Sequence, residues 1–339
     1  MKPVKLQDVA DRAGVSAKTV SRVVNREPQV RASTREKVLR VIEELHFRPN
    51  KSAQSLAADR SLLIGLLYDN PSPAYITGLQ EGVLRACDQF GYGLVIQPCD
   101  HRDAGMIKTL QDLLVSTRMD GVVLSPPFTE NQEIFALLDE YQTPFALISP
   151  LDQSQTRPLV FTDDVAAAKQ AMRHLFDLGH RRIGFIRGLR RRSGSEMRFT
   201  GYQQALQENG IEFDERLVAD GQFTFESAEQ GAHALLQQED PPTAIFASSD
   251  YMAAGVLKAA RTLEIAVPDE LSICGFDDNP ISRYLTPTLT TMSHPVRKLA
   301  EQAGELLIRQ LKKHDGAAPP TPAYSELIVR ESTAPVKAR

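Results

Sequence analysis

The sequence predicts an all-α head followed by an α/β body with two lobes. Apolar residues recur at helical spacing over roughly the first fifty positions, and from Ser61 short apolar runs alternate with helix-like stretches in two successive series. Charge divides at the same place: residues 1–60 hold 13 Lys or Arg and seven Asp or Glu, whereas the remainder holds 26 basic and 36 acidic residues. A basic head on an acidic body is typical of a protein that brings one end to nucleic-acid phosphate.

Two short helices joined by a tight turn are predicted near the amino terminus. Apolar side chains recur at helical spacing from Leu6 to Ala13. Gly14 then supplies the backbone freedom that a sharp turn needs, and the Ser16 hydroxyl is placed to cap the helix that follows. This pattern is that of the helix-turn-helix, which places its second helix in the DNA major groove.

The second helix has an apolar face and a polar face. Its valines are expected to point back to a small core: Val15, Val20, Val23 and Val24. The remaining positions are expected to face outward: Ala17, Lys18, Ser21 and Arg22. Because Lys and Arg side chains can donate to guanine O6 and N7, Lys18 and Arg22 are candidates for reading bases.

A third helix is expected to open at Ser33, with Glu36 completing a capping box, and to end at Pro49. Residues 50–58 follow, and they are rich in small residues and compatible with a helix. Such a segment is too short to form a stable helix alone in water. It is therefore either a plain linker or a hinge that folds only on DNA.

Residues 1–67 resemble the DNA-binding head and hinge of the lactose-repressor/galactose-repressor (LacI/GalR) family. The matching segments are Lys2-Pro3-Val4, Val15-Ser16, Thr19 to Asn25 and Asn50 to Leu56. The resemblance implies that two subunits bind a near-palindromic operator in double-stranded DNA, with paired hinge helices in the minor groove. Leu56 would then be wedged into a central base step, and an apolar wedge unstacks and kinks a duplex.

The same resemblance implies which residues contact DNA. Phosphate contacts, which position the protein without specifying sequence, fall to Ser16, Thr19, Ser21, Asn25 and Thr34. The base-reading positions are Ala17, Lys18 and Arg22, although Ala17 is also explained as a good helix former. The hinge contributes Asn50, Ala53 and Leu56.

The body is predicted to contain two buried parallel sheets, because continuous apolar strands alternate with helix-like stretches such as 78–90 and 132–141. The first series of strands covers 62–68, 94–99, 121–125 and 145–149, and the second covers 159–162, 183–186, 244–247 and 273–276. Ligands of such sheets bind beyond the carboxyl ends of the strands. That rule selects Asp69, Ser125, Ser149, Ser249–Asp250 and Asp277–Asp278.

Residues 61–331 resemble the effector domain of the same family, a two-lobed fold like the type I periplasmic binding proteins. The clearest matches are Leu178 to Ile183, Arg198 with Gly201-Tyr202, Ser249 to Ala253 and Gly275 to Asp278. The implied domains are a head (1–48), a hinge (49–60) and an effector and dimerisation domain (61–333). Its first lobe would hold about 61–160 and 291–322, and its second lobe about 161–290 and 323–333.

The resemblance implies a sugar site in the cleft. Arg198 and Asp277 fall on the family's two main sugar-hydroxyl ligands, where a guanidinium donates and a carboxylate accepts; a salt bridge between the lobes is the alternative. Since the chain has no Trp, Phe223 or Tyr75 would stack on a sugar face, unless both simply pack in the core. Ser149 and Ser249 stand where the family often has an acid or an amide.

Four arginines precede Arg198: Arg187, Arg190, Arg191 and Arg192. They could recognise a phosphate or carboxylate with paired hydrogen bonds, or they could form a solvent-exposed loop. Arg192 also stands where the purine-responsive member of the family places a ligand arginine, which keeps a nucleobase as an alternative effector. The candidate effector residues are therefore Asp69, Tyr75, Ser125, Ser149, Arg192, Arg198, Phe223, Ser249 and Asp277.

Other classes of protein fit the sequence poorly. The carboxylate pairs Asp163–Asp164 and Asp277–Asp278 are adjacent residues that point to opposite sides of a strand, and no phosphate loop, zinc spacing or nucleophile elbow is present. Cys87, Cys99 and Cys274 show no metal or redox spacing. We therefore expect no enzyme activity and no cofactor. The absence of a signal peptide and of an apolar run of membrane length predicts a cytoplasmic protein with no membrane partner.

The expected function is that of a ligand-controlled transcriptional repressor of carbohydrate-utilisation genes, which a small sugar releases from its operator. The alternatives are a corepressor-type regulator of a purine or an anionic metabolite, and a sugar-binding protein without a DNA role. Tetramers of the family use a C-terminal leucine heptad, and residues 333–339 contain none. A homodimer is therefore expected, associated with the nucleoid when it is bound to the operator.

Overall fold

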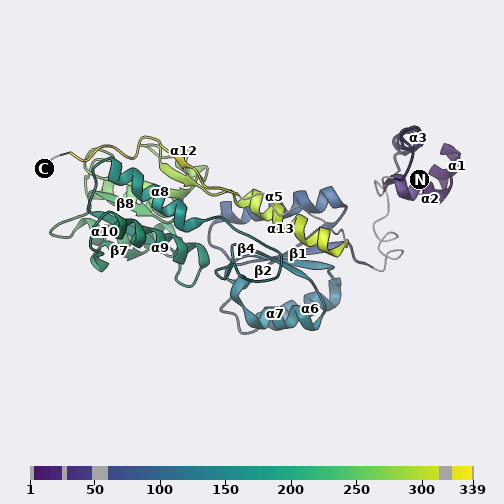
Figure 1. Ribbon diagram of the computed structural model, residues 1–339, viewed down its shortest axis with the longest axis horizontal. Helices are drawn as coiled ribbons and strands as arrows, with labels where there is room; N and C mark the ends of the chain where they lie inside the picture. Colours follow the sequence, from purple (N-terminus) through teal and green to yellow (C-terminus); the bar gives the residue numbers. More distant parts are fainter. Residues whose placement is uncertain (1–3, 25–28, 48–59, 313–322, 338–339) are drawn as a thin grey trace. The chain divides into compact units, whose positions relative to one another are not determined.

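The computed structural model describes residues 4–24, 29–47, 60–312 and 323–337 of the chain. The chain divides into two compact units, Met1–Leu62 and Leu63–Arg339, which Figure 1 colours along the sequence. Within the described residues, no helix has the length and apolar character needed to cross a membrane.

The described residues of the first unit form three helices, α1 (Leu6–Ala13), α2 (Ala17–Val24) and α3 (Ala32–Glu44). Their apolar faces enclose a core of Val9, Ala10, Ala13, Val20, Val23, Val38, Val41 and Phe47. Gly14 ends α1 in the left-handed region at φ 61°, and the backbone N–H of Thr19 donates to the Ser16 hydroxyl over 3.1 Å. The predicted turn and helix cap are thus confirmed.

The start of α3 differs from the prediction. The helix begins at Ala32, and Arg31 stands at the N-cap without a side-chain cap. Ser33 therefore lies inside the first turn, where its backbone is already helical and its hydroxyl cannot act as the N-cap. The predicted capping box of Ser33 and Glu36 is wrong, and α3 ends at Glu44, before Pro49.

The first lobe of the second unit is built on a five-stranded parallel sheet in the order β2-β1-β3-β4-β5. Its strands are β1 (Leu63–Tyr68), β2 (Gly93–Pro98), β3 (Gly121–Leu124), β4 (Phe145–Ile148) and β5 (Leu159–Val160). Helices α5 (Pro73–Phe90) and α13 (Val296–Leu311) cover one face, and α6 (Met106–Thr117) and α7 (Gln132–Glu140) cover the other (Figure 1). Every residue of β3 and β4 is buried, which explains their continuous apolar sequence.

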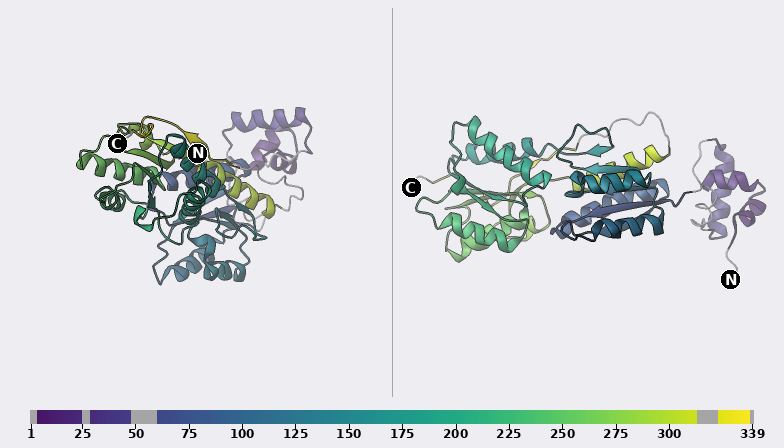
Figure 2. Two further views of the ribbon diagram at one scale, coloured as in Figure 1. Left: turned by 60° about the vertical axis from the view of Figure 1, so that its left-hand side comes forward. Right: turned by 90° about the horizontal axis from the view of Figure 1, so that it is seen from below.

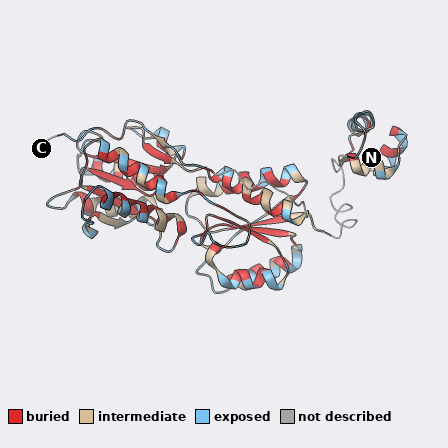
Figure 3. Ribbon diagram, in the orientation of Figure 1, coloured by how far each residue is buried: buried red, intermediate tan, exposed pale blue. Residues whose placement is uncertain are grey.

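The second lobe is built on a six-stranded sheet in the order β11-β10-β9-β8-β6-β7, and its β10–β11 pair is antiparallel. The strands are β6 (Ile183–Arg187), β7 (Val218–Asp220), β8 (Ala244–Ala247), β9 (Ser272–Asp277), β10 (Thr290–Ser293) and β11 (Leu327–Ile328). One core lies under α8 (Asp164–Asp177) and α9 (Ser193–Glu208), and the other under α10 (Phe225–Leu236) and α11 (Asp250–Thr262). Figures 2 and 3 show helices on both faces of the sheet and the buried strands between them.

The chain crosses between the lobes after β5, after β10 and before β11. Because β10 pairs with β9 as far as Ser293, residues 291–293 belong to the second lobe, three residues beyond the expected boundary. Helix α13 then packs against α5, β3 and β4 of the first lobe. The short strands β7, β10 and β11 were not predicted, since none of them has the apolar run of a strand that is buried on both faces.

Candidate functional site

Helix α2 presents the candidate DNA contacts of the first unit. Lys18 and Ser16 are exposed, Thr19, Ser21 and Arg22 are partly exposed, and the hydroxyls of Ser16 and Thr19 lie 2.9 Å apart. Ala17 does not face fully outward, because it lies three residues before Val20 on the same side of the helix and packs partly against the core.

The remaining DNA candidates lie elsewhere. Thr34 is partly buried in the first turn of α3. Four candidates lie outside the described residues: Asn25, Asn50, Ala53 and Leu56. The structure therefore brings the α2 candidates onto one short helix and leaves the predicted hinge contacts as predictions.

A small cavity lies between the two lobes of the second unit, beyond the carboxyl ends of several strands. Its volume is about 60 Å³. Seven of the nine candidate effector residues line it: Tyr75, Ser149, Arg192, Arg198, Phe223, Ser249 and Asp277. Ser125 is fully buried beneath it and donates its hydroxyl to the Leu67 carbonyl at 3.2 Å, so the structure does not place Ser125 in the cavity wall.

Arg198 is a buried side chain of the cavity wall with several polar partners. It is 5% exposed on α9, its Nε donates to Asp164 Oδ2 at 3.0 Å, and its Nη1 donates to the Ser248 carbonyl at 2.6 Å. Asp277 Oδ1 lies 3.6 Å from Nη1. The guanidinium carbon also lies 3.6 Å from the centroid of the Phe276 ring, a cation–π contact. The salt bridge therefore lies within the second lobe and not between lobes.

Three titratable groups near Arg198 have shifted pKa values, in different directions. Burial raises the pKa of Asp277 to about 7, against the opposing effect of Arg198. Burial would also raise the pKa of Asp164, but Arg198, His294 and a hydrogen bond from Thr162 lower it below its ordinary value. Burial lowers the pKa of His294 to about 4, so this imidazole is neutral near pH 7.

Three buried polar atoms of the cavity wall have no hydrogen-bond partner among the described residues. They are Ser149 Oγ, Ser195 Oγ and His294 Nδ1. Buried polar atoms are nearly always paired in proteins, because an unpaired one loses its hydration without compensation. Two hydroxyls and one imidazole nitrogen of the cavity wall can therefore form hydrogen bonds with a polar ligand.

Aromatic rings stand on both sides of the cavity. Tyr75 from α5 lies parallel to His294, with ring centroids 6.4 Å apart and planes 9° apart. Phe223 from the second lobe lines the cavity and packs against the apolar core under α10 and α11. Each lobe therefore supplies one aromatic ring that can pack against an apolar face of a ligand.

The arginine cluster does not act as one group. Arg187 pairs with Glu196, Arg190 pairs with Asp220, and Arg191 is exposed. Only Arg192 of these four lines the cavity, where it crosses to the first lobe and donates to the carbonyls of Asp69 (2.6 Å) and Pro126 (2.8 Å). Its Nη2 lies 3.5 Å from the Asp69 carboxylate, so Asp69 contributes by holding Arg192.

Asp164, His294, Ser193 and Ser195 line the cavity without having been predicted. A signal existed for Asp164: Asp163 accepts from the Ala166 N–H as the N-cap of α8, which turns the next carboxylate inward. His294 follows β10, a strand too short and polar to be predicted. Ser193 lies on the first turn of α9 and donates to the Ser149 carbonyl at 2.6 Å, a second contact between the lobes.

Among the described residues, one group of side chains brings three potential metal ligands together: Asp69, Asp100 and His101. His101 Nδ1 lies 2.5 Å from Asp69 Oδ2, and Arg102 pairs with Asp100. Hydrogen bonds and ion pairs therefore account for the grouping without a metal ion.

Comparisons with known proteins agree with both units. Residues 5–50 match the model of the bacterial regulatory proteins of the lacI family, and residues 172–333 match the periplasmic binding protein-like domain. The HTH-type transcriptional repressor PurR of Pectobacterium carotovorum is 33% identical over 339 residues, covering 97% of this chain and 96% of PurR.

Two solved structures share this architecture over nearly the whole chain. The lac repressor dimer bound to operator and the anti-inducer ONPF has a TM-score of 0.77 at 27% identity and covers 98% of this chain and 100% of that one. The complex of the transcriptional regulator CelR with cellobiose has a TM-score of 0.72 at 29% identity and covers 97% and 99%. The chain therefore belongs to the LacI family of bacterial regulatory proteins, which are DNA-binding transcriptional regulators and not enzymes.

Proposed function

We propose that this repressor binds a near-palindromic operator as a homodimer and that a small neutral sugar, bound between the lobes, releases it from DNA. The set of Arg198, Asp164 and Asp277 carries the proposal. In the proposed layout, residues 1–48 read DNA, 49–60 form the hinge, and 61–333 bind the effector and the second subunit. The protein would act in the cytoplasm, on the nucleoid when it is bound to its operator.

The chemistry of the cavity suits a molecule with several hydroxyl groups. A hydroxyl can donate to Asp277 or His294 Nδ1, and it can accept from Arg198 or from the serine hydroxyls. Charge-assisted hydrogen bonds to Arg and Asp are the stronger ones, and they gain strength away from water. Tyr75 and Phe223 can cover the apolar face of a sugar ring. CelR bound to cellobiose is a relative with a sugar ligand.

Charge supports a neutral effector over an anionic one. Arg198 lies between Asp164 and Asp277, and Arg192 is held by Asp69 and two backbone carbonyls. The cavity thus offers no unopposed cation to a phosphate or a carboxylate. Because Arg192 is engaged with the first lobe, the same contacts also weaken the alternative of a purine held by that arginine.

The size of the cavity supports a change in lobe arrangement on binding. Ligand sites usually enclose about 300–1,000 Å³, whereas this cavity encloses about 60 Å³. Admitting a sugar therefore requires the lobes to separate or turn. A ligand that prefers one arrangement shifts the equilibrium by its difference in affinity, which is how binding between the lobes would change operator affinity.

Operator release by a panel of ligands tests this function. Operator DNA is first selected from random duplexes, and fluorescence anisotropy then follows its release by neutral sugars, sugar phosphates, sugar acids and purines. We expect a neutral mono- or disaccharide to release DNA and to raise the melting temperature, adding about 2.7 kcal/mol of stability at a hundredfold excess over Kd. Release by phosphorylated, acidic or purine ligands alone would overturn the neutral-sugar proposal.

Sugar affinity is expected to depend on pH through Asp277, whose pKa burial raises to about 7. A sugar hydroxyl that donates to this carboxyl group binds its ionised form better, so affinity should rise with pH toward about 7 and then level off. The pKa of Asp277 is higher in the folded protein than in the unfolded chain, so between these two values the folded state holds a proton that the unfolded state has lost. The free energy of unfolding therefore falls as pH rises toward about 7, and bound sugar offsets that loss of stability.

Isothermal titration calorimetry in buffers of different ionisation enthalpy, between about pH 5 and 8, measures this effect as protons released on sugar binding. Asp277→Asn is expected to weaken binding and to remove the pH slope near neutrality. If the slope survives unchanged in Asp277→Asn, a different group controls it.

A further inference from the structure

Two consecutive aspartates at the end of β9 have a left-handed backbone. The φ angles are 114° at Asp277 and 49° at Asp278. Residues with a Cβ are strained in this region, and such strain persists only where the surrounding structure fixes it. The turn directs the two carboxylates to different partners: Asp277 lies near Arg198 in the cavity, and Asp278 binds Arg330.

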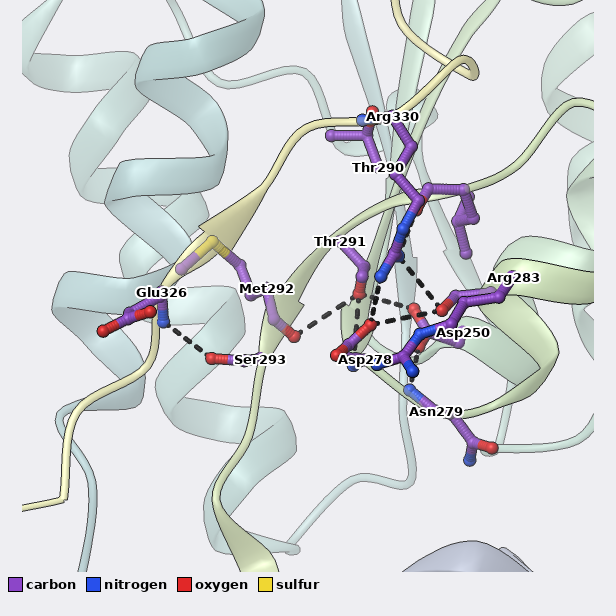
Figure 4. A network of polar contacts seen from close by, with 12 residues as sticks. Asp250, Asp278, Asn279, Arg283, Thr290, Thr291, Met292, Ser293, Glu326 and Arg330 are labelled. Atoms are coloured by element: carbon purple, nitrogen blue, oxygen red, sulfur yellow. Dashed lines mark hydrogen bonds and ion pairs between the residues drawn. The ribbon is translucent and has the colours of Figure 1, made fainter.

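The ion pair of Asp278 with Arg330 is shielded from solvent. Arg330 Nη2 donates to Asp278 Oδ1 at 2.6 Å, and both side chains are 15% exposed. Arg283 donates to the other carboxylate oxygen at 2.9 Å, but its side chain is 62% exposed (Figure 4). Ion pairs are weakened by solvent and salt in proportion to their exposure. Arg330 is therefore the partner that fixes Asp278.

Arg330 joins three segments of chain. Its Nη1 donates to the Leu289 carbonyl at 2.8 Å and to Ser282 Oγ at 3.1 Å, and its backbone N–H donates to Thr290 Oγ1 at 2.9 Å. It lies two residues after β11, in the segment that follows the last crossing between the lobes. Arg330 thus connects the turn after β9 and the start of β10 to the segment after β11.

Asp250 holds the same turn from the other side. This fully buried carboxylate accepts from the backbone N–H of Asn279 and from Thr291 Oγ1 of β10, both at 2.6 Å (Figure 4). Gly275 leaves the space that Asp250 occupies, since a Cβ there would overlap its Oδ1. Both supports of the turn, Arg330 and Asp250, are therefore attached to β10.

Strand β10 leads out of the second lobe. Ser293 ends it and is bound to Glu326 of the returning chain by two hydrogen bonds, at 2.8 and 2.9 Å. The crossing after β10 and the crossing before β11 are thus hydrogen-bonded to each other at the edge of the second-lobe sheet. Any rotation of the lobes must act on this pair of crossings.

We propose that Asp278 and Arg330 are a positioning pair that holds the Asp277 carboxylate toward the cavity and couples it to the paired crossings at β10 and β11. This proposal rests on the proposed function of the cavity as an effector site. A movement of the crossings shifts Arg330, and through Asp278 it shifts the neighbouring carboxylate that receives the effector. The pair itself does not touch the effector.

The test compares Arg330→Met, Asp278→Asn and the double variant with a matched control, Arg283→Met, which removes the exposed partner of the same carboxylate. The probe is the neutral sugar that releases the wild-type protein from operator DNA. We expect Arg330→Met and Asp278→Asn each to weaken sugar binding about tenfold or more, and the double variant to be no worse than Arg330→Met. Operator affinity without sugar and the Arg283→Met variant should stay within about twofold of wild type.

A second readout needs no sugar. Carboxyl-carbon NMR follows the titration of Asp277, which is expected to shift in Arg330→Met, because the turn that positions this carboxylate loses its support, and to stay in place in Arg283→Met. Asp278→Asn preserves the shape of the side chain and serves if Arg330→Met does not fold. Unchanged sugar affinity and an unchanged Asp277 titration in both variants would overturn the positioning role. If no neutral sugar binds the wild-type protein, the proposed function fails, and the NMR titration still decides the positioning role.

Discussion

Arg198→Met is expected to abolish release by sugar while operator binding without sugar persists. The variant loses the donors that face the cavity, and each hydrogen bond to a charged group contributes about 1.5–3 kcal/mol. Two such bonds correspond to a loss of sugar affinity on the order of a hundredfold or more. Fluorescence anisotropy of operator DNA, titrated with sugar, measures both quantities in one experiment.

The thermal stability of the Arg198→Met variant must also be measured, because the substitution disturbs a buried ion pair. Removal of Arg198 leaves the Asp164 carboxylate buried without its main partner, since the two side chains are 6% and 5% exposed. Breaking such a pair costs about 3–5 kcal/mol. Adding Asp164→Asn is expected to restore part of that stability without restoring sugar binding. Arg190→Met is the matched control, because Arg190 pairs with Asp220 at an exposed site. If a folded Arg198→Met protein is still released from DNA by sugar, the assignment of Arg198 to the effector site is wrong.

Val20→Asp is expected to abolish operator binding and to leave sugar binding intact. Val20 is fully buried in the core of the three-helix unit. An unpaired buried carboxylate costs several kcal/mol, which is comparable with the whole stability of so small a unit. The second unit has its own cores, so its folding is expected not to depend on the first unit.

Leu39→Asp is the matched control, since it adds the same charge to the same unit at a side chain that is 49% exposed. It should lower operator affinity only through charge, an effect that salt screens. Calorimetric melting should show the transition of the second unit unchanged in both variants. Loss of sugar binding in Val20→Asp would show that the two units do not fold independently.

The sequence predicted the strands that have continuous apolar runs, and each predicted run is a strand in the structure, from β1 to β9 apart from β7. These include β2, an edge strand that is not buried. The run 159–162 was wrongly expected to begin the second sheet: as β5 it pairs with β4 in the first lobe. β10 begins with two threonines, and β11 pairs through only two residues. Their pairing is set by the crossings between the lobes, which no local pattern reveals.

The candidate site was predictable where it follows predicted strands. The rule that ligands bind beyond strand ends selected Ser149, Ser249 and Asp277, all of which line the cavity. It did not select Asp164, although this residue closely follows the predicted strand 159–162, and it could not select His294, because β10 was not predicted. Sequence also could not separate Arg192 from its neighbour Arg191, since a left-handed turn at Arg191, with φ 64°, directs the two side chains differently.

The path of α13 has a consequence for how the chain folds during synthesis. The helix belongs to the first lobe but is made after nearly all of the second, and it covers Val83 and Ala86 of α5. A ribosome therefore releases the apolar face of α5 more than two hundred residues before its cover, whereas the helical head is complete early. Such a face is a natural target for chaperones and a route to aggregation. Truncation between Val160 and Val296 should leave the first lobe unfinished, even though its whole sheet is present.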